Sequence, residues 1–252
     1  MKTQEIRELT LNYIKAPHPS IYFYAPEEGK VMRMIDGIAK ELGIEYVYTY
    51  DLGDGLKIIK GKDSKVEYNR NEISTTLSYL RGLKEKALVI FLGAASIFNA
   101  NPASKRVLKN IINEIKEGLP LTLLFVSTAL SIPEDIERET IVMDIPYPSR
   151  DEIQKAIQNF VKEHGIQIKE ELKTSLLNSL TGLCDSEIDN MLHICLASYG
   201  KLNEESINII ISQKEQIIRK GGFLEFISIK DENNKAGALK KLQDWLADKK
   251  NI

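Results

Sequence analysis

The chain has 252 residues, of which 43% are hydrophobic and 28% charged, enough for one large domain or for one domain with a small appendage. Its 34 basic and 36 acidic residues leave a formal net charge of -2, which gives no global electrostatic basis for binding DNA or an anionic membrane. Two cysteines make neither a disulfide framework nor a metal site, and no apolar run reaches membrane-spanning length. Because Met1–Tyr13 is typical of a helix and not of a signal peptide, we expect a cytoplasmic protein.

Five short runs of apolar, β-favouring residues are predicted strands, and helical patterns separate them. The third and fourth runs are almost free of polar residues, as expected of parallel strands buried on both faces. The alternation predicts an α/β fold, in which a parallel sheet carries helices on both faces. The five runs are Ile21–Tyr24, Ile44–Tyr50, Ala87–Leu92, Leu121–Val126 and Thr140–Ile145.

Three helices are predicted between these strands from apolar spacing and from their start and stop residues. A proline at the first helical position opens the third, and glycines close the first and the third. The predicted ranges are Val31–Gly43, Asn71–Lys86 and Asn101–Gly118. The stretch Leu56–Tyr68, with a Gly-Lys-Asp sequence in its middle, is expected to form a small hairpin.

The pattern changes at Pro146-Tyr147-Pro148, after which only helices are predicted. Ser149 and Glu152 form a capping box at the start of the first of these helices. The predicted domains are an α/β core at 1–147, a helical lid at 148–230, and a linker with a short helix at 231–252. Because four short helices can only partly bury long apolar stripes among themselves, the remainder of the stripe that contains Leu176 is expected to pack on the sheet domain.

The loop after the first predicted strand is where a parallel sheet would bind a phosphate-containing ligand. Residues 24–31 read YAPEEGKV, against G-x-x-x-x-G-K-[ST] in a working P-loop. Gly29 and Lys30 stand at the positions of the second glycine and the lysine. Since a glycine and a lysine at a helix start often coincide by chance, the alternative is an exposed first turn with favourably placed acidic residues.

The other residues of this loop disfavour phosphate binding. A tyrosine replaces the glycine of the tight turn, a proline removes a backbone donor, two carboxylates occupy the phosphate positions, and a valine cannot bind Mg²⁺. These residues are Tyr24, Pro26, Glu27, Glu28 and Val31.

Further elements of ATPase chemistry are missing or equivocal at the other strand ends. Gly93 follows the third strand, where a carboxylate would be needed to hold Mg²⁺. Ser127 and Thr128 follow the fourth strand, where such ATPases carry a polar sensor residue, although Ser and Thr also form turns there. Arg138 could act in trans as an arginine finger, or it is simply a solvated arginine. No histidine has the spacing of a metal ligand. We therefore predict no catalytic residue and no metal site.

Several segments carry a resemblance to a known family. Leu180–Leu183, with the sequence LTGL before a helix, resembles a lid segment of AAA+ ATPases. Over essentially its full length the chain resembles the N-terminal region of a family of AAA+ ATPases known from plastid genomes, cyanobacteria and other bacteria. In that family, a region without Walker motifs precedes a true AAA+ module. The most specific segments are Ala25–Ile35, Lys214–Lys220 and Gly237–Leu246.

The resemblance implies a degenerate AAA+ core with a P-loop-NTPase-like sheet, followed by its lid. It implies an interaction and oligomerisation region without ATPase activity or a cofactor of its own, with ATP and Mg²⁺ expected only for the downstream module. The implied partners are that module of the same polypeptide, further copies of the full-length chain and another protein. No membrane and no nucleic acid is expected. Because the chain stops before any Walker A sequence, we expect a fragment or a naturally short protein.

The C-terminal segment is predicted to be a docking handle for the downstream module. Its apolar residues recur at helical spacing, and its single tryptophan adds aromatic surface. They are Leu239, Leu242, Trp245 and Leu246. The alternative is that this segment packs back on the lid. Two other functions stay open: a degenerate clamp-loader-type subunit acting with DNA, and an ATP-binding module with an unorthodox site.

Overall fold

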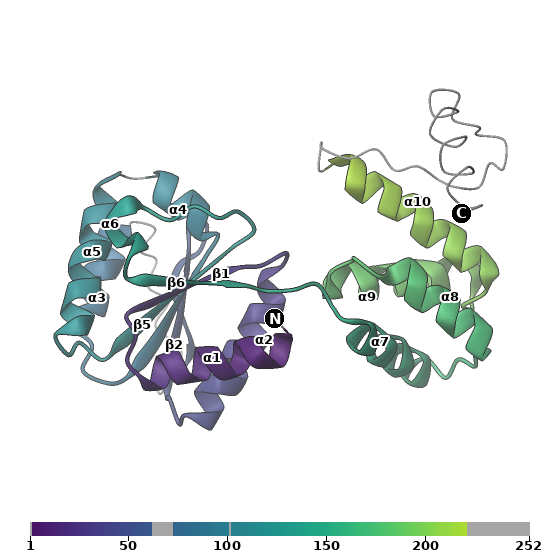
Figure 1. The fold of residues 1–252 in the computed structure, drawn as a ribbon, viewed down its shortest axis with the longest axis horizontal. Helices are drawn as coiled ribbons and strands as arrows, with labels where there is room; N and C mark the ends of the chain where they lie inside the picture. The colour runs from purple at the N-terminus through teal and green to yellow at the C-terminus, as the bar shows by residue number, and fades with distance from the viewer. Residues whose placement is uncertain (1, 62–72, 101, 221–252) are drawn as a thin grey trace, which may run out of the picture.

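The computed structural model describes residues 2–61, 73–100 and 102–220. An α/β domain comes first, an extended segment follows it, and a group of helices forms the second domain (Figure 1). Within these ranges, no helix is both long and apolar enough to cross a membrane.

The α/β domain contains a six-stranded sheet in the order β3-β2-β4-β5-β1-β6. All neighbouring strands are parallel except β3, which runs antiparallel to β2 at one edge. The predicted fold class, a largely parallel sheet with helices on both faces followed by an all-helical part, is confirmed. The strands are β1 (Ser20–Tyr24), β2 (Tyr46–Asp51), β3 (Gly55–Lys60), β4 (Ala87–Leu92), β5 (Leu121–Ser127) and β6 (Thr140–Asp144).

Alternating side chains of the central strands bury the two faces of the sheet in separate apolar clusters. Ile21 and Phe23 point to the face covered by α1 (Thr3–Lys15) and α2 (Glu28–Glu41). Tyr22 points to the opposite face. The helices on that face are α3 (Ile73–Leu80), α4 (Ala94–Ala100), α5 (Pro102–Lys116) and α6 (Glu134–Glu137), seen in Figure 1.

The strand order fixes where a ligand site would lie. After β1 the chain passes over β5 and β4 to reach β2, whereas after β5 it passes over β1 to reach β6. The connections that follow two neighbouring strands therefore run in opposite directions. In open α/β sheets such a reversal opens a crevice at the carboxyl ends of the strands. The loop of residues 24–31 begins at this point.

The structure corrects two sequence predictions in the α/β domain and adds two short helices. The residues predicted to form one arm of a hairpin within Leu56–Tyr68 pair instead with the preceding strand as β3, and residues 62–72 lie outside the described ranges. The helix predicted to end near Lys86 ends at Leu80, because residues 81 and 82 form a turn. The short helices α4 and α6 were not predicted, since seven and four residues are too few to show helical periodicity.

The helical lid consists of α7 (Arg150–Glu163), α8 (Glu170–Leu180), α9 (Asp185–Tyr199) and α10 (Glu204–Lys220). The capping box predicted at Ser149 and Glu152 is confirmed at the start of α7. Lys214 of α10 donates to the backbone carbonyls of Ser179 and Thr181, which satisfies free acceptors at the end of α8.

The apolar residues of the lid form one cluster of their own. Leu176 and Leu180 are fully buried in it, and Leu172 is partly buried. Every member of this cluster comes from the lid, and both clusters of the α/β domain contain only residues of that domain. The prediction that part of the lid stripe packs on the sheet domain is therefore wrong for the residues that the structure describes. The two domains meet through polar contacts instead.

Candidate functional site

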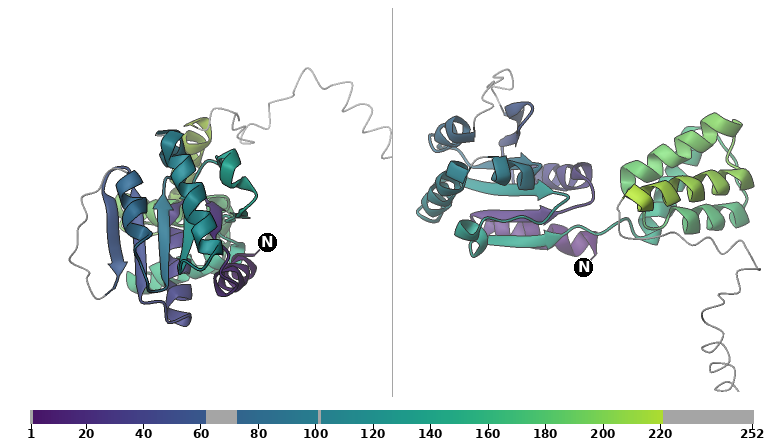
Figure 2. Two further views of the ribbon diagram at one scale, coloured as in Figure 1. Left: turned by 90° about the vertical axis from the view of Figure 1, so that its left-hand side faces the viewer. Right: turned by 90° about the horizontal axis from the view of Figure 1, so that it is seen from above.

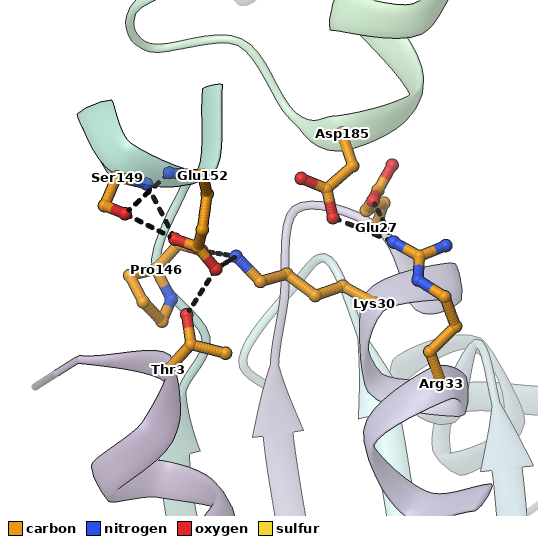
Figure 3. Close-up of polar contacts among 8 residues, drawn as sticks. All are labelled: Thr3, Glu27, Lys30, Arg33, Pro146, Ser149, Glu152 and Asp185. Atoms are coloured by element: carbon orange, nitrogen blue, oxygen red, sulfur yellow. Dashed lines mark hydrogen bonds and ion pairs between the residues drawn. The ribbon is translucent and has the colours of Figure 1, made fainter. Parts of the chain in front are cut away.

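Gly29 and Lys30 lie in the first turn of α2, at the carboxyl end of β1. The Lys30 side chain crosses to the start of the lid and is only 8% exposed (Figure 3). Its Nζ donates to the carbonyl oxygen of Pro146 over 3.2 Å and lies 3.6 Å from Oε1 of Glu152. A buried ammonium group is stable only when it is paired, and here both partners come from the same chain.

Glu152 is the third residue of α7 and has two roles. Its Oε2 accepts from the backbone N and from Oγ of Ser149, which closes the capping box. Its Oε1 faces Lys30 and accepts from the Thr3 hydroxyl over 3.3 Å. Burial alone would raise the pKa of Glu152, but the Ser149 hydrogen bonds, the Lys30 charge and the Thr3 hydroxyl together hold that pKa below its ordinary value.

Glu27 and Arg33 form a second group of contacts between the domains. Oε2 of Glu27 accepts from the backbone N of Ser186, in the first turn of α9, over 3.1 Å. Arg33 Nη2 lies 2.8 Å from Oδ2 of Asp185 and 3.7 Å from Oε1 of Glu27 (Figure 3). Burial alone would raise the pKa of Glu27, but the Ser186 hydrogen bonds and the Arg33 charge lower it. A carboxylate of the α/β domain thus occupies the positive end of a lid helix.

Glu28 makes a contact within the α/β domain. Its Oε1 accepts from the backbone N of Gly93 over 2.9 Å, which ties the start of α2 to the end of β4. Gly93 has a φ of 66°, in the left-handed region that glycine adopts at little cost. The sequence predicted no carboxylate at the end of β4, and the structure brings one there from α2.

We call the contacts between Glu27, Lys30 and Arg33 of the α/β domain and Glu152, Asp185 and Ser186 of the lid the latch. Each of its charged groups is bonded within the chain. Chemically, the latch holds one domain against the other by directional polar contacts, which respond to pH and salt more strongly than an apolar interface does.

The remaining residues singled out from the sequence do not join the latch. Ser127 ends β5, is buried, and its Oγ accepts from the backbone N of Ala129, as in a turn. Thr128 beside it is exposed, and Arg138 is exposed at the end of α6. The predicted interaction residues Leu239, Leu242, Trp245 and Leu246 lie outside the described residues.

A cavity of about 260 Å³ opens between α7 and α9 beside the latch. Its lining is acidic and includes Glu152, Glu163, Asp185 and Asp189. Such a lining repels a phosphate-bearing ligand. The part of the chain that the structure describes contains no group of three or more His, Cys, Asp or Glu residues arranged to hold a metal ion.

The lid half of the latch was not predicted from the sequence. Glu152 was identified as a capping residue, but its contact with Lys30 joins residues 122 positions apart in the chain, and no local pattern encodes such a pairing. Two histidines far apart in the sequence, His164 and His193, also meet, with ring centroids 5.3 Å apart beside Phe160. The signal that could have located the latch is the concentration of opposite charges at the starts of α2, α7 and α9.

Two models of one protein family match the chain in succession. Residues 6–145 match the SpoVK-like AAA ATPase N-terminal domain, and residues 151–221 match the second domain of the same ATPases. The AAA domain-containing protein ycf46 of Trieres chinensis is 26% identical over 237 residues, which cover 94% of this chain and 47% of that protein. Its counterpart in Pyropia yezoensis is 27% identical over 245 residues, covering 97% and 48%. The chain therefore spans about half the length of these relatives.

Solved structures share the fold at low sequence identity. The Thermotoga maritima RuvB Holliday junction branch migration motor aligns with a TM-score of 0.57 at 13% identity, covering 85% of this chain and 70% of that one. Caenorhabditis elegans PCH-2 aligns with a TM-score of 0.58 at 11% identity, covering 86% and 70%. Domain III of the Thermotoga maritima replication initiation protein DnaA aligns with a TM-score of 0.55 at 8% identity, covering 83% and 91%.

Proposed function

The chain belongs to the SpoVK-like AAA ATPases, and we propose that within such a protein it forms a non-catalytic region for interaction and oligomerisation. The observation that carries this proposal is the latch. In it, the lysine at the position of a P-loop lysine is buried and paired with a carboxylate of the lid. The chain itself thus holds the arrangement of the two domains that a bound nucleotide would otherwise have to stabilise.

The residues of the loop do not fit a nucleotide phosphate. A phosphate at Lys30 would have to displace Glu152, and it would approach the carboxylates of Glu27 and Glu28. Two like charges about 4 Å apart repel each other by on the order of 4 kcal/mol at an effective dielectric constant of about 20, which disfavours binding. Pro26 offers no backbone N–H, and Val31 is buried in the α/β core.

A latched pair of domains presents fixed surfaces to its neighbours. We propose that these surfaces receive the downstream AAA+ module of the same polypeptide and further copies of the full-length chain. The length of the ycf46 relatives, about twice that of this chain, supports the first partner. ATP and Mg²⁺ would then act in the downstream module, and this chain would set how the modules are spaced.

Isothermal titration calorimetry with Mg·ATP tests the central claim. The chain and its Lys30→Ala variant should both show no binding at sub-millimolar concentrations. Lys40→Ala is the matched control, because Lys40 lies on the same helix and pairs on the surface with Asp36. Sub-millimolar binding that Lys30→Ala abolishes and Lys40→Ala preserves would contradict the proposal and favour an unorthodox nucleotide site.

The alternative of a clamp-loader-type subunit acting with DNA is tested by gel mobility shift. RuvB and DnaA, two of the structures with this fold, are named for Holliday junction migration and replication initiation, but the likeness extends to the fold alone. With a net charge of -2, the chain should give no shift even at low salt. A shift that weakens steeply as salt rises would favour the DNA-acting alternative.

The handle proposed at residues 238–246 is tested by the fluorescence of Trp245, the single tryptophan. If these residues dock on the downstream module, adding that module should quench the emission of Trp245 or shift it to shorter wavelength. Emission that is already shifted in this chain, and that does not change when the module is added, would show instead that the segment packs on its own chain.

A further inference from the structure

Three large side chains near the domain junction are exposed. Tyr24 at the end of β1 is 42% exposed, Leu130 after β5 is 58% exposed and Tyr147 between the domains is 53% exposed. Tyr147 lies close enough to Tyr24 for the two to interact electrostatically. We call these three residues the junction patch.

The junction patch lies on the α3–α6 side of the sheet. Tyr22 belongs to the apolar cluster on that side, and Tyr24 follows it by two residues, so the two side chains leave the same face of β1. The Tyr22 hydroxyl donates to the carbonyl of Ala129 and accepts from the backbone N of Ser131. These two bonds place Leu130, between them, above the same face.

The Tyr24 part of the patch is held in place by the sheet. The backbone of Tyr24 is fixed on one side by Ile145 N, which donates to the Tyr24 carbonyl over 2.8 Å. On the other side, Ala25 N donates to the carbonyl of Ser127 over 3.0 Å. An exposed side chain on a fixed backbone is typical of a binding surface, since little conformational entropy is lost when it is covered.

The course of α10 indicates which segment covers the patch. Its C-terminal end points back toward the α/β domain in two perpendicular views, on the side of α4 rather than of α2 (Figures 1 and 2). Gly221-Gly222 follows, a pair that allows a sharp change of chain direction. The next seven residues, 223–229, read FLEFISI, and five of them are Phe, Leu or Ile.

We propose that residues 223–229 pack on the junction patch and form a second, apolar tie between the domains, in addition to the latch. The tether favours this occupant over a free partner, because a segment joined by a short linker has an effective concentration in the millimolar range. The bulky side chains of Phe223 and Phe226 suit a surface of two tyrosines and a leucine, since aromatic pairs gain energy beyond the area that they bury.

Disulfide trapping in the full chain tests this proposal. With Leu130→Cys and Phe226→Cys combined, mild oxidation should give an intramolecular disulfide in most molecules, seen as faster migration of the monomer on a non-reducing gel. The control combines Leu52→Cys with Phe226→Cys, because Leu52 is also exposed but lies in the β2–β3 turn. The two native cysteines, Cys184 and Cys195, are buried.

Three results would overturn the proposal. Equal trapping in the control pair would show that the segment has no preferred location. A disulfide that joins two chains and grows with protein concentration would assign the patch to a second copy. Absence of any disulfide would leave the patch to another partner.

A double-mutant cycle gives an independent measurement. Leu130→Ser and Phe226→Ser should each lower the urea midpoint of the full chain, and the double variant should fall no further than the lower of the two singles. Additive shifts would contradict a direct contact. Neither residue belongs to the latch, so failure here leaves the nucleotide test of the proposed function unaffected.

Discussion

Phe125 and Lys30 lie in the same domain and are both buried, but they are held by opposite kinds of contact. Phe125 sits at the centre of the sheet, with its ring centroid 5.4 Å from that of Phe91 and 5.1 Å from that of Phe98. Lys30 lies at the domain junction, where its Nζ has a carbonyl and a carboxylate as partners. The packing of Phe125 depends on how well side chains fill the space around it. The contacts of Lys30 depend on charge and on the direction of hydrogen bonds.

This difference separates folding from domain arrangement. The apolar clusters stay within one domain or the other, so each domain has its own source of stability. The junction between them depends on the latch, whose contribution changes with pH and salt. The four predictions below test this division, in order of decreasing effect.

The largest effect is expected inside the α/β core. Phe125→Ala removes a fully buried ring and should lower the free energy of unfolding of that domain by about 3–5 kcal/mol, as large-to-small substitutions in cores do. Urea unfolding followed by circular dichroism measures it. Leu52→Ala, at an exposed position, should change it by less than about 0.5 kcal/mol. Similar losses in the two variants would mean that the core is not packed as described.

Removal of one latch carboxylate should have an intermediate effect. Glu152→Ala leaves the Lys30 ammonium buried without its charged partner and opens the capping box, so we expect a loss of about 1–3 kcal/mol. The double variant Lys30→Met/Glu152→Gln tests the reason, because an apolar side chain of similar length needs no partner. It should recover part of the loss in urea unfolding. If the double variant is as unstable as Glu152→Ala, the loss of stability comes from the helix cap alone and not from the unpaired Lys30.

Acid should loosen the latch. Both Glu27 and Glu152 have folded-state pKa values below the ordinary 4.5, so the folded protein binds fewer protons than the unfolded chain. Their contribution to stability is therefore complete above about pH 4.5 and is lost as the pH falls through the lowered pKa values. Urea midpoints measured from pH 6 down to pH 3 should fall less steeply in Glu27→Gln and Glu152→Gln than in the unchanged chain. If the urea midpoints of the variants and of the unchanged chain fall equally with pH, neither carboxyl is the source of the acid sensitivity.

The smallest effect is expected at the exposed pair of the latch. Arg33 and Asp185 keep much of their contact with water, so Asp185→Asn should cost about 0–1 kcal/mol in low salt and less as the salt concentration rises. Asp36→Asn, which breaks a surface pair with Lys40 further along the same helix, is the matched control. The effect of salt on the exchange of amide hydrogens near Ser186 should differ between Asp185→Asn and the unchanged chain. It should be the same in Asp36→Asn and the unchanged chain.

The sequence predicted the sheet well because its signals are local. Runs such as Ala87–Leu92 have the composition of a strand buried on both faces, and Gly118, with a φ of 117°, ends the helix before β5 as expected. The pairing of edge strand β3 with β2 was not predicted, although the Gly-Asp-Gly sequence at their connection is a hairpin signal. The Asp51 carboxylate stabilises this turn by accepting from two backbone N–H groups.

The candidate site was predicted only in half. Gly29 and Lys30 were located from the P-loop spacing, and the misfit of Glu27 and Glu28 was recognised. Their actual partners, Ser186 and Gly93, are backbone groups, and a backbone N–H has no sequence signature. The contact of a charged side chain with a helix terminus far away in the sequence can be identified only from the three-dimensional arrangement of the domains.

Glu152 couples two events that could otherwise occur separately. Its carboxylate completes the first turn of α7 and also receives Lys30 from the other domain. Starting a helix is the slow and costly step of its formation, and a bonded first turn lowers that cost. A formed first turn of α7 therefore holds the carboxylate in place for Lys30, and Lys30 in turn favours that first turn. Folding of the lid and closing of the junction stabilise each other through this one side chain.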